Sequence, residues 1–365
     1  MPVIDGPDAE VALANGATQA TQATEATEAT QAIQATDASE AVQAAVIAAA
    51  AQRLADGGLV AFPTETVYGL GARADDDAAV ARIFAAKGRP ADHPLIVHLS
   101  QPAAASHFSH PLSPAAQRLM AAFWPGPLTL IVPRRPGVAA AAAGGQDSIG
   151  LRLPSHPMAQ ALLAHAARLG VPGVAAPSAN RFGRVSPTTA AHVAQEFGPG
   201  LMVLDGGMCA VGIESAIVDC TREQPALLRP GQLSRLQIEA VLGTALAASD
   251  AASPRASGTL ASHYAPTAAV RLWDRAALQQ RLSALPPAEE GEGGVAVYSR
   301  LIPAGALGWS HRAMPETAAA TAHELFSVLR DLDRADVAAI WVESPPLGAE
   351  WDGVRDRLER AAASR

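Results

Sequence analysis

The sequence predicts an α/β protein with two separate sheets. Short apolar runs alternate with longer runs of helix-forming residues, which is the pattern of strands connected through helices. The chain has 365 residues and is 49% hydrophobic, enough for two domains with a core each. A stretch poor in large apolar side chains and dotted with Ser, Gly and Pro divides the alternating regions. We expect a larger domain over residues 46–242, a linker over 243–268 and a smaller domain over 269–365.

Residues 1–45 are expected to form a disordered, low-complexity tail. From residue 18 to residue 44 the sequence runs in triplets, TQA TQA TEA TEA TQA IQA TDA SEA VQA, and a period of three fits neither helix nor strand. The stretch has almost no large apolar side chains, so it buries too little surface to offset the entropy of ordering. Strong helix formers over residues 41–55 precede Gly57, so order is expected to begin near residue 41.

The larger domain is predicted from apolar runs and helix signals taken in order. The runs expected to form buried strands are 59–62, 95–99, 128–132, 149–153, 174–176, 201–204, 216–219 and 226–229. Acidic residues at 75–77 are typical helix caps, and the helix they begin should run through Lys87. Further helices are expected near 114–123, 156–168, 188–197 and 234–242.

The smaller domain repeats this alternation on a reduced scale. Strands are expected at 270–273, 295–298 and 339–342, with helices near 275–284, 316–333 and 352–363. This pattern predicts a small three-stranded α/β module of the open-sheet kind. It has no Gly-x-Gly-x-x-Gly, so nothing in its sequence points to nucleotide binding there.

Charge and cysteine content narrow the class of function. Residues 1–45 hold seven acids and no base, while residues 46–240 hold fifteen bases and thirteen acids. A slightly cationic middle segment suits an enzyme for anionic small molecules better than a protein that coats nucleic acid. Two cysteines give neither a disulfide framework nor a metal-ligand set. No signal pattern or transmembrane-length apolar run is present, so a cytoplasmic protein without membrane contact is expected.

Polar and cationic residues gather where predicted strands end. Thr66 follows the first strand, His98 ends the second, Ser178 follows the strand at 174–176, and Arg229 ends the strand at 226–229. Open α/β sheets place ligands at such ends, and arginines beside several hydroxyls suit a polyanion together with a small polar ligand. Neither a Walker loop nor a Ser-His-Asp or Cys-His arrangement stands out.

Two cations are informative by themselves. Of the 27 lysines and arginines, Lys87 is the one lysine, so its position is expected to need a compact ammonium rather than a planar fork. Arg152 lies within an apolar strand, where a buried guanidinium needs an anionic partner, and no acid near it in sequence offers one. Taken singly, Thr66 is read as an ordinary turn residue and His98 as a satisfied buried histidine.

Seven motifs taken together are far more specific. In order they are PTETVYGLG, KGRPADHPLIVH, WPGPLTL, LRLP, APSANRFG-x-x-SPTT, ESAIVD and LLRPG. In this order and spacing the chain resembles the threonylcarbamoyl-AMP synthase family of the YrdC type, and the SHYAP segment with the C-terminal module resembles its long form. The resemblance implies a YrdC-like open twisted mixed sheet, followed by a small Rossmann-like α/β domain. The Ser262-His263-Tyr264 segment is too particular for a simple spacer, so residues 243–268 are also expected to act as a lid over the phosphates.

The resemblance also implies a reaction. Threonine, bicarbonate and ATP would give threonylcarbamoyl-adenylate and pyrophosphate, with Mg²⁺ accompanying ATP. The product would pass to a downstream transferase complex that modifies tRNA next to the anticodon, with a possible weak contact to tRNA itself. A carbamate formed from the threonine amine would attack the α-phosphate, so the protein must supply positioning and charge neutralisation rather than a side-chain nucleophile.

Roles for single residues follow from matching the motifs. Lys87 and Arg89 would be catalytic, meeting the polyphosphate and its developing charge. The residues that match the ATP site are Arg89, His93, Ser148, Asn180, Thr188, Arg229 and Tyr264. The residues that match the threonine site are Thr66, His98, Arg152, Ser178 and Ser215, with Arg152 clamping the carboxylate; no residue matches a metal ligand. Many relatives have Asn in place of His93, and the linker here lacks the basic residues that commonly precede the His-Tyr pair.

Two other classes of function stay open at this point. One is an RNA-binding module of the same fold without synthase activity, which the complete pocket and the near-neutral middle segment disfavour. The other is a related carbamoyl-transfer domain from hydrogenase maturation, whose zinc-finger segments have no counterpart here because the chain has no Cys-x-x-Cys.

Overall fold

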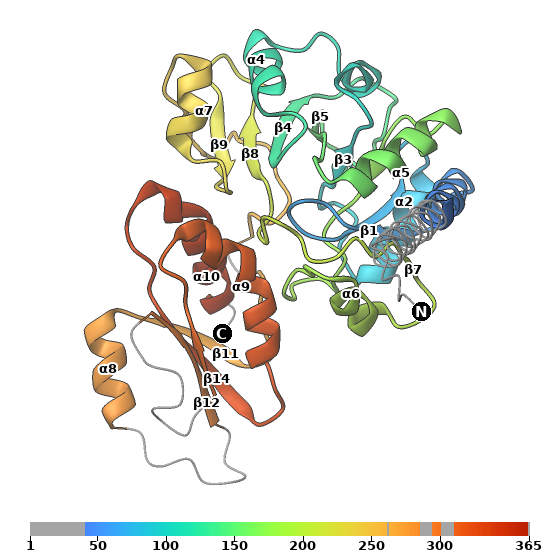
Figure 1. The fold of residues 1–365 in the computed structure, drawn as a ribbon. Coiled ribbons are helices and arrows are strands. Elements are labelled where there is room, and N and C mark those ends of the chain that lie inside the picture. The colour runs from blue at the N-terminus through green and yellow to red at the C-terminus, as the bar shows by residue number, and fades with distance from the viewer. Residues whose placement is uncertain (1–40, 261–262, 285–293, 301–309, 364–365) are drawn as a thin grey trace, which may run out of the picture. The chain divides into compact units, whose positions relative to one another are not determined.

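A computed structural model describes residues 41–260, 263–284, 294–300 and 310–363 (Figure 1). Most of the expected tail, residues 1–40, therefore lies outside the described residues. A helix occupies residues 41–55, as its strong helix formers predict. The expected tail extended to residue 45, so its last five residues, 41–45, are helical and that boundary was set too late.

The larger sheet is mixed, as expected, and in the described residues it has ten strands. These are β1 (Val60–Phe62), β2 (Gly69–Arg73), β3 (Ile96–His98), β4 (Leu128–Pro133), β5 (Ser148–Arg152), β6 (Val174–Ala175), β7 (Met202–Val203), β8 (Ala216–Asp219), β9 (Ala226–Arg229) and β10 (Ala247–Ala248). Their order is β10-β9-β8-β4-β5-β3-β6-β2-β1-β7. The pairs β3–β5 and β4–β8 are parallel, whereas β4–β5 and β8–β9 are antiparallel.

Two strands of this sheet were not expected from the sequence. β10 lies inside the segment expected to be a linker and pairs with β9. β2 contains Gly69 and Gly71, and glycine is disfavoured in strands, so this segment gave no strand signal. The structure explains Gly71: a Cβ there would lie 2.8 Å from atoms of both Phe62 and Val174. Glycine is needed because two side chains close over this point of the sheet.

The helices of this region have the bounds that capping signals predict, to within two residues. They are α2 (Asp77–Lys87), α3 (Ala105–Phe108), α4 (Pro114–Phe123), α5 (Pro157–Arg168), α6 (Ala190–Phe197) and α7 (Arg235–Leu242), with a short 3₁₀ turn at Pro102–Ala104. α3 and the 3₁₀ turn were not expected, so the agreement in bounds holds for the other five helices. The Asp76 side chain caps α2 by accepting from Ala78 N and Ala79 N, and Ser234 caps α7. No described helix has both the length and the apolar character that crossing a membrane requires.

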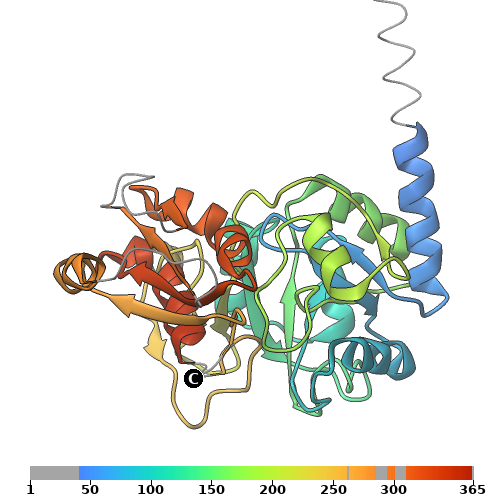
Figure 2. The same cartoon turned by 90° about the horizontal axis from the view of Figure 1, so that it is seen from below.

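The second sheet has four described strands rather than the three expected. These are β11 (Ala269–Trp273), β12 (Gly294–Ser299), β13 (His311–Ala313) and β14 (Val337–Glu343), all parallel, in the order β11-β14-β12-β13. Its helices are α8 (Arg275–Ser283), α9 (Ala318–Leu332) and α10 (Asp352–Ala362), with a 3₁₀ turn at Ala349–Trp351. The extra strand, β13, has three residues and an exposed, basic sequence, so it gave no apolar signal. The orange-to-red part of Figure 2 shows this sheet from below.

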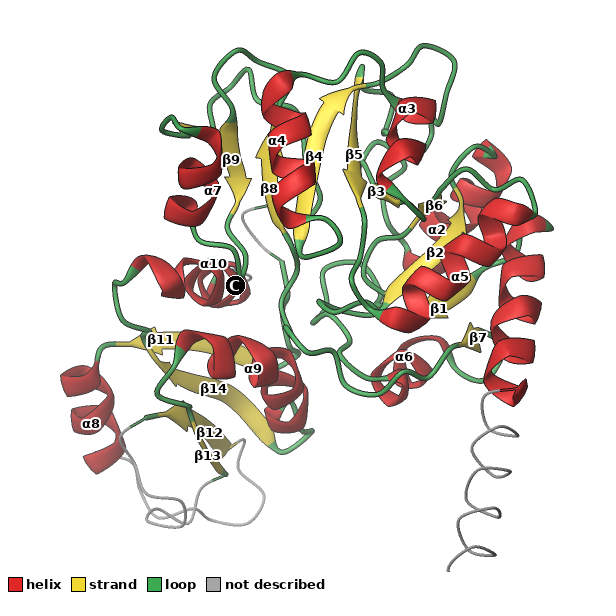
Figure 3. Ribbon diagram, turned by 45° about the horizontal axis from the view of Figure 1, so that its top comes forward, coloured by secondary structure: helices red, strands yellow, loops and turns green. Residues whose placement is uncertain are grey.

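Alternating side chains give this sheet two covered faces. On β12, Val297 packs with Leu278 and Leu282 of α8. The neighbouring Ala296 and Tyr298 belong to the opposite cluster, which includes side chains of α9 and α10. Figure 3 shows α8 apart from α9 and α10. The module is therefore a three-layer α/β unit.

The core of this module also includes side chains from loops that connect strands of the larger sheet. Val67, Val211 and Ile213 belong to the same buried cluster as Phe326 of α9 and Leu358 of α10. At the contact with α9, Gly212 has φ +82°, and a Cβ there would lie 2.3 Å from the carbonyl oxygens of Ala322 and His323. The loop before β8 is thus held against α9 at a distance that only glycine permits.

We expect Gly212→Ala to lower the free energy of unfolding by about 3 kcal/mol or more, since a left-handed backbone and overpacking both cost energy. Gly243 is the matched control, because it has φ +71° and a Cβ added there would meet no atom within 4 Å. Gly243→Ala should cost only the left-handed strain, about 1 kcal/mol. Denaturant unfolding of both variants measures the difference, and equal losses would show that α9 does not press on this loop.

Candidate active site

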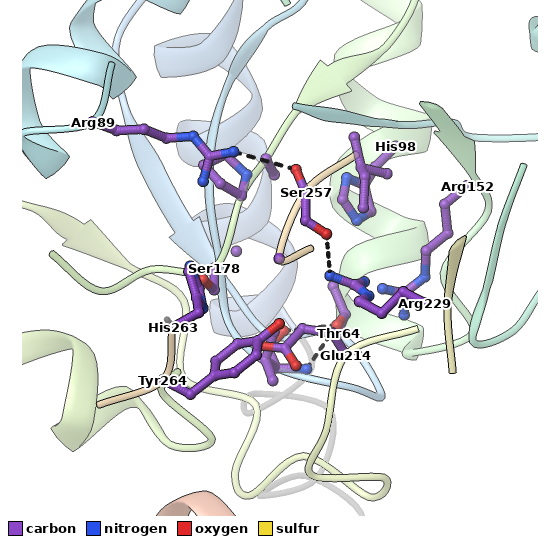
Figure 4. Close-up of a pocket in the computed structure, with 16 residues that line it drawn as sticks. Thr64, Arg89, His98, Arg152, Ser178, Glu214, Arg229, Ser257, His263 and Tyr264 are labelled. Atoms are coloured by element: carbon purple, nitrogen blue, oxygen red, sulfur yellow. Dashed lines mark hydrogen bonds between the residues drawn. The ribbon is translucent and has the colours of Figure 1, made fainter. Parts of the chain in front are cut away.

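One pocket collects polar residues from strands, loops and the segment after β10 (Figure 4). Its lining consists of Thr64, Val67, Gly69, Arg89, Ile96, His98, Arg152, Ala176, Pro177, Ser178, Glu214, Arg229, Ser257, Gly258, His263 and Tyr264. Residues as far apart in the sequence as Thr64 and Tyr264 thus meet in one cavity.

The pocket lies on one face of the larger sheet because strand side chains alternate. On β3, Val97 points into the main core, whereas Ile96 and His98 line the pocket. On β5, Leu151 belongs to the main core and Arg152 lines the pocket. β3 and β5 are parallel with His98 opposite Arg152, so the register brings the two side chains together. The apolar face anchors the strands and leaves the polar face for a ligand.

Arg152 is the centre of one half of the pocket. The residue is 3% exposed, and the guanidinium donates to Gly126 O at 3.3 Å, to Thr66 Oγ1 at 2.9 Å and to Glu65 Oε1 at 2.6 Å. A guanidinium has five N–H donors, and the hydrogen bonds found among the described residues use three of them. The fixed plane leaves donors for a planar anion such as a carboxylate.

The anionic partner of Arg152 is Glu65, which nothing in the sequence around Arg152 indicated. The two residues are 87 positions apart, and the fold places the loop after β1 beside β5. Glu65 Oε2 also accepts from Ser155 N at 3.0 Å, so the carboxylate is held at both oxygens. Tertiary contact of this kind leaves no trace in local sequence.

His98 beside Arg152 is held in its neutral form. Burial, and then the charge of Arg152, lower the pKa of His98 to about 3. Its ring also meets Phe62 edge-on, at 6.0 Å between centroids. A neutral imidazole next to a guanidinium leaves the guanidinium as the cation of this half of the pocket.

Two arginines form the other half of the pocket. Arg229 donates to Ser215 O at 3.1 Å, to Ser215 Oγ at 3.2 Å and to Ser257 O at 2.8 Å. Arg89 donates to Pro94 O at 3.0 Å and contacts Ser257 Oγ at 3.5 Å. Burial lowers the pKa of Arg89 to about 10. The charge of Arg229 also lowers this pKa, whereas Tyr264 raises it. Both arginines thus bond to the segment that carries Ser257, and their charges have no carboxylate in direct contact among the described residues.

Lys87 lies behind this cationic half and does not line the pocket. Its ammonium donates to Ser178 O at 2.5 Å and to Asn180 O, and the side chain is 3% exposed. Burial lowers the pKa of Lys87 well below its usual value, and the charge of Arg89 adds to that effect. Two carbonyl oxygens converge on one point, which suits a compact ammonium, as the single lysine of the sequence predicts.

Five buried polar atoms at or next to the pocket have no hydrogen-bond partner among the described residues: Arg89 Nε, His98 Nδ1, Asn180 Oδ1, His263 Nδ1 and Tyr264 Oη. Buried polar groups are nearly always paired, and the exceptions call for an explanation such as a ligand. Tyr264 also has φ +62°, a left-handed backbone that an aromatic residue adopts only when the surroundings impose it.

The structure divides the residues predicted for the site into three groups. Those that line the pocket are Arg89, His98, Arg152, Ser178, Arg229 and Tyr264. Four others touch this lining by hydrogen bonds: Lys87 and Asn180 through the loop at 178–180, Thr66 through Arg152, and Ser215 through Arg229. The remaining three, His93, Ser148 and Thr188, are not in the lining.

Those three residues have identifiable surroundings. His93 stacks edge-on with Phe182 at 5.4 Å between ring centroids, and Arg89 lies 5.8 Å from the same ring. Ser148 begins β5 and lines a smaller adjoining cavity with Ser257. Thr188 is buried, and its backbone N–H donates to His192 Nδ1 at 3.3 Å.

Four polar pocket residues were not among the predicted site residues: Thr64, Glu214, Ser257 and His263. Thr64 stands two positions before Thr66 in the PTETVYGLG motif. Glu214 precedes Ser215 within the ESAIVD motif, and His263 precedes Tyr264 within SHYAP, so a motif neighbour was the available signal for both. Ser257 lies in the segment expected to be a linker and gave no signal, because its role depends on where the chain returns to the pocket.

Comparison with known protein families gives a match for each of the two sheets. A family model named for Sua5, YciO and YrdC and described as "Telomere recombination" matches residues 52–231. A second model, described as the C-terminal domain of threonylcarbamoyl-AMP synthase, matches residues 233–363. Together the two models account for both the larger sheet and the C-terminal module.

Similar whole proteins cover nearly the same length. Threonylcarbamoyl-AMP synthase from Pyrococcus abyssi is 38% identical, over 87% of this chain and 94% of its own. The Bacillus subtilis enzyme of the same name is 38% identical, over 87% and 93%. A crystal structure of Pyrococcus abyssi Sua5 complexed with L-threonine matches with a TM-score of 0.78 at 36% identity, covering 87% of this chain and 94% of that one. The chain belongs to the threonylcarbamoyl-AMP synthase family.

Proposed function

We propose that this protein is an L-threonylcarbamoyladenylate synthase, which converts L-threonine, bicarbonate and ATP to threonylcarbamoyl-AMP and pyrophosphate. The observation that carries the proposal is one pocket with two different cationic halves. Arg152, fixed in plane by Glu65 and Thr66, suits a small carboxylate. Arg89 and Arg229, which no carboxylate of the described residues contacts directly, suit a polyphosphate. A pocket with both halves suits a reaction that joins an amino acid to a nucleotide.

The threonine half is proposed to bind by its carboxylate and hydroxyl. Arg152 supplies the free guanidinium donors, and Thr66, Ser178, Ser215 and His98 supply smaller polar groups around it. The neutral His98 donates or accepts a hydrogen bond without adding a charge. Because the carboxylate is held, the carbamate formed at the amine is directed toward the other half of the pocket, and the proximity of the reactants lowers the barrier.

The nucleotide half is proposed to neutralise the phosphates. Arg89 and Arg229 meet the phosphate charge, and Lys87 holds the loop at 178–180 while adding a positive potential behind it. The unpaired atoms of Asn180 and Tyr264 are available to the nucleotide. Charge placed in advance in a buried pocket stabilises the charge that develops as pyrophosphate leaves. His93, Ser148 and Thr188 stay predictions for this half.

The segment carrying Ser257 is proposed to act as a lid. Ser257 Oγ donates to Pro94 O at 2.7 Å, and its carbonyl accepts from Arg229, so it covers the arginines that the phosphates would need. A nucleotide entering this half would take over those donors. A lid closed over the product would shield a hydrolysable acyl-adenylate from water.

Mg²⁺ is proposed to enter with ATP, held mainly by its phosphates, as this ion usually does in nucleotide enzymes. No group of three His, Cys, Asp or Glu side chains suited to a metal occurs among the described residues. The ion would add phosphate neutralisation to that of the arginines. The product is proposed to pass in the cytoplasm to a downstream tRNA-modifying transferase complex, with at most a weak direct contact to tRNA.

The activity itself is the first test. Purified full-length protein should release pyrophosphate from ATP only when L-threonine and bicarbonate are both present, because the carbamate is the nucleophile. Omitting each substrate in turn, with a coupled pyrophosphate assay, measures this. Equal release without threonine would refute the assignment, and tight salt-sensitive RNA binding without release would favour an RNA-binding module instead.

Arg152→Lys should weaken threonine binding although the charge is kept, because an ammonium does not copy the planar fork. The expected loss is about 2–4 kcal/mol of binding free energy, with ATP binding changed much less. Titration calorimetry with each ligand measures both. Arg235→Lys, on α7 with its bond to Leu246 O, is the matched control. An equal fall in the affinities for ATP and threonine would make Arg152 a structural residue.

Lys87→Arg should lower kcat by at least about tenfold, or 1.4 kcal/mol of barrier, with the fold intact. The reason is that two carbonyl oxygens converge where a larger planar group does not fit. Arg82→Lys, on the same helix, is the control. Steady-state turnover and the melting temperature measure the effect, and wild-type turnover in Lys87→Arg would contradict it.

A further inference from the structure

Arg357 is the largest fully buried side chain of the described residues, and it comes from the last helix, α10. Its guanidinium donates to Glu214 Oε2 at 2.8 Å, to Glu214 O at 3.0 Å, to Pro230 O at 2.9 Å and to Asp356 Oδ2 at 2.7 Å. Of these three partners, Glu214 lies in the loop that leads into β8, and Pro230 directly follows β9. The side chain does not line the pocket itself.

The atoms that Arg357 holds are next to residues of the pocket. Glu214 lines the pocket and directly precedes Ser215, whose hydroxyl and carbonyl bind Arg229. Pro230 directly follows Arg229 at the end of β9. One guanidinium from the C-terminal module thus fixes the chain on both sides of the Ser215–Arg229 contact, and with it the position of Arg229 in the nucleotide half.

Arg357 also lies against Tyr264. Its guanidinium carbon is 5.5 Å from the centre of the Tyr264 ring, within the range of a cation–π contact. Tyr264 is 1% exposed, lines the pocket beside Glu214 (Figure 4) and has the left-handed backbone noted above. The same side chain therefore supports a third pocket residue, from the segment that leads out of the proposed lid.

Helix α10 packs closely against the turn that follows β9. A Cβ on Gly353 would lie 2.8 Å from Gly231 O and 2.8 Å from a side-chain carbon of Ile213. Gly353 and Arg357 are four residues apart, so they lie on the same face of α10. Glycine lets the helix approach the turn after β9, and the arginine then reaches the carboxylate behind it.

The charge of Glu214 depends on this contact. Burial by itself would raise the pKa of Glu214, but the charges of Arg357 and then Arg229 outweigh it, so the pKa lies below its usual value. The other titratable groups facing it are His263 and Tyr264, whose pKa values burial moves to about 3 and about 12, so both are neutral near pH 7. Without Arg357, burial would keep Glu214 protonated to a higher pH.

We infer that Arg357 is a positioning residue for the nucleotide half of the active site, through Glu214, the Arg229–Pro230 turn and Tyr264, so that the C-terminal module completes the site. The inference rests on the proposed function for its readout of activity. An alternative is that Arg357 only joins the C-terminal module to the rest of the chain. The two differ in what they predict for a folded variant: a joint alone changes stability, whereas a positioning residue also changes ATP kinetics and the pH profile.

The experiment compares four full-length variants with the wild type. Arg357→Lys keeps the charge but loses the fork, and Arg357→Met removes both. Arg357→Met combined with Glu214→Gln also removes the carboxylate left unpaired. Arg355→Met is the matched control, since Arg355 on the same helix bonds, among the described residues, to Asp352, Pro346 and Gly348 of its own module. Pyrophosphate release against ATP and threonine, its pH profile, calorimetric binding and the melting temperature are measured for each.

Arg357→Lys should stay folded and lose at least about tenfold in kcat/KM for ATP. Threonine affinity should change much less, because Arg152, the proposed carboxylate clamp, lies outside this network and Ser215 alone of the threonine half belongs to it. In Arg357→Met the acid limb of the pH profile should move to higher pH, and Glu214→Gln in the double variant should abolish that shift. Arg355→Met should match the wild type. If Arg357→Met does not fold, Arg357→Lys decides the question.

Folded Arg357 variants with wild-type ATP kinetics and an unmoved pH profile would overturn the inference, as would equal losses for ATP and threonine. Failure of the proposed function would look different: the wild type itself would release no pyrophosphate. In that case calorimetric ATP binding still tests Arg357, because a weakened affinity in Arg357→Lys needs no turnover.

Discussion

Positive charge buried around one pocket is the constraint on which the rest of this structure depends. Lys87, Arg89, Arg152 and Arg229 are each at least nine-tenths buried. Removing a charge from water costs several kcal/mol unless partners replace the water. Arg152 receives the carboxylate of Glu65, whereas the other three are bound mainly by backbone carbonyls and hydroxyls. The carbonyls must therefore stand at fixed places, and the loops that carry them are held by the sheet.

This arrangement leaves the pocket short of negative charge. Carbonyl oxygens compensate a cation partly, and a polyphosphate would compensate it fully. The pocket holds its cations at positions that suit the ligand better than they suit the protein alone. Such preorganisation is what transfer of an adenylyl group needs, since charge develops there without any reorganisation of the surroundings. A few buried polar atoms among the described residues, such as Tyr264 Oη, likewise lack a partner in the protein and are available to a ligand.

The C-terminal module shares in this arrangement through packing and charge. Its core continues into the loops at 211–213, and Glu196 of α6 pairs with Arg330 of α9 at 2.9 Å. Contacts of this kind join a module without a pocket motif of its own to the loops that form the pocket. Its sequence by itself predicts an independent small α/β unit, because local periodicity indicates strands and helices but not their contacts with distant segments. The carboxylates that meet Arg330 and Arg357, Glu196 and Glu214 of the larger domain, lie 134 and 143 positions away.

Local sequence was sufficient for most elements and for the chemical kind of the site. Strands such as β4 and β8 are continuous apolar runs, and α2 and α7 carry their caps in sequence, so they were predicted within two residues. The strand β2 was missed because its glycines serve a contact with Phe62 that lies outside the strand. The lone Lys87 and the buried Arg152 were recognisable because composition and polarity mark them as exceptions.

By itself the sequence determined the α/β class, the two alternating regions and the cationic, hydroxyl-rich character of the site. Only the tertiary structure decided which acid neutralises Arg152, that Lys87 stands behind the pocket, and that Arg357 reaches Glu214. The physical reason is range. Periodicity and capping act over a few residues and are written along the chain, whereas the partner of a buried charge is set by which strands are neighbours in the sheet, and strand order follows from the packing of the whole chain.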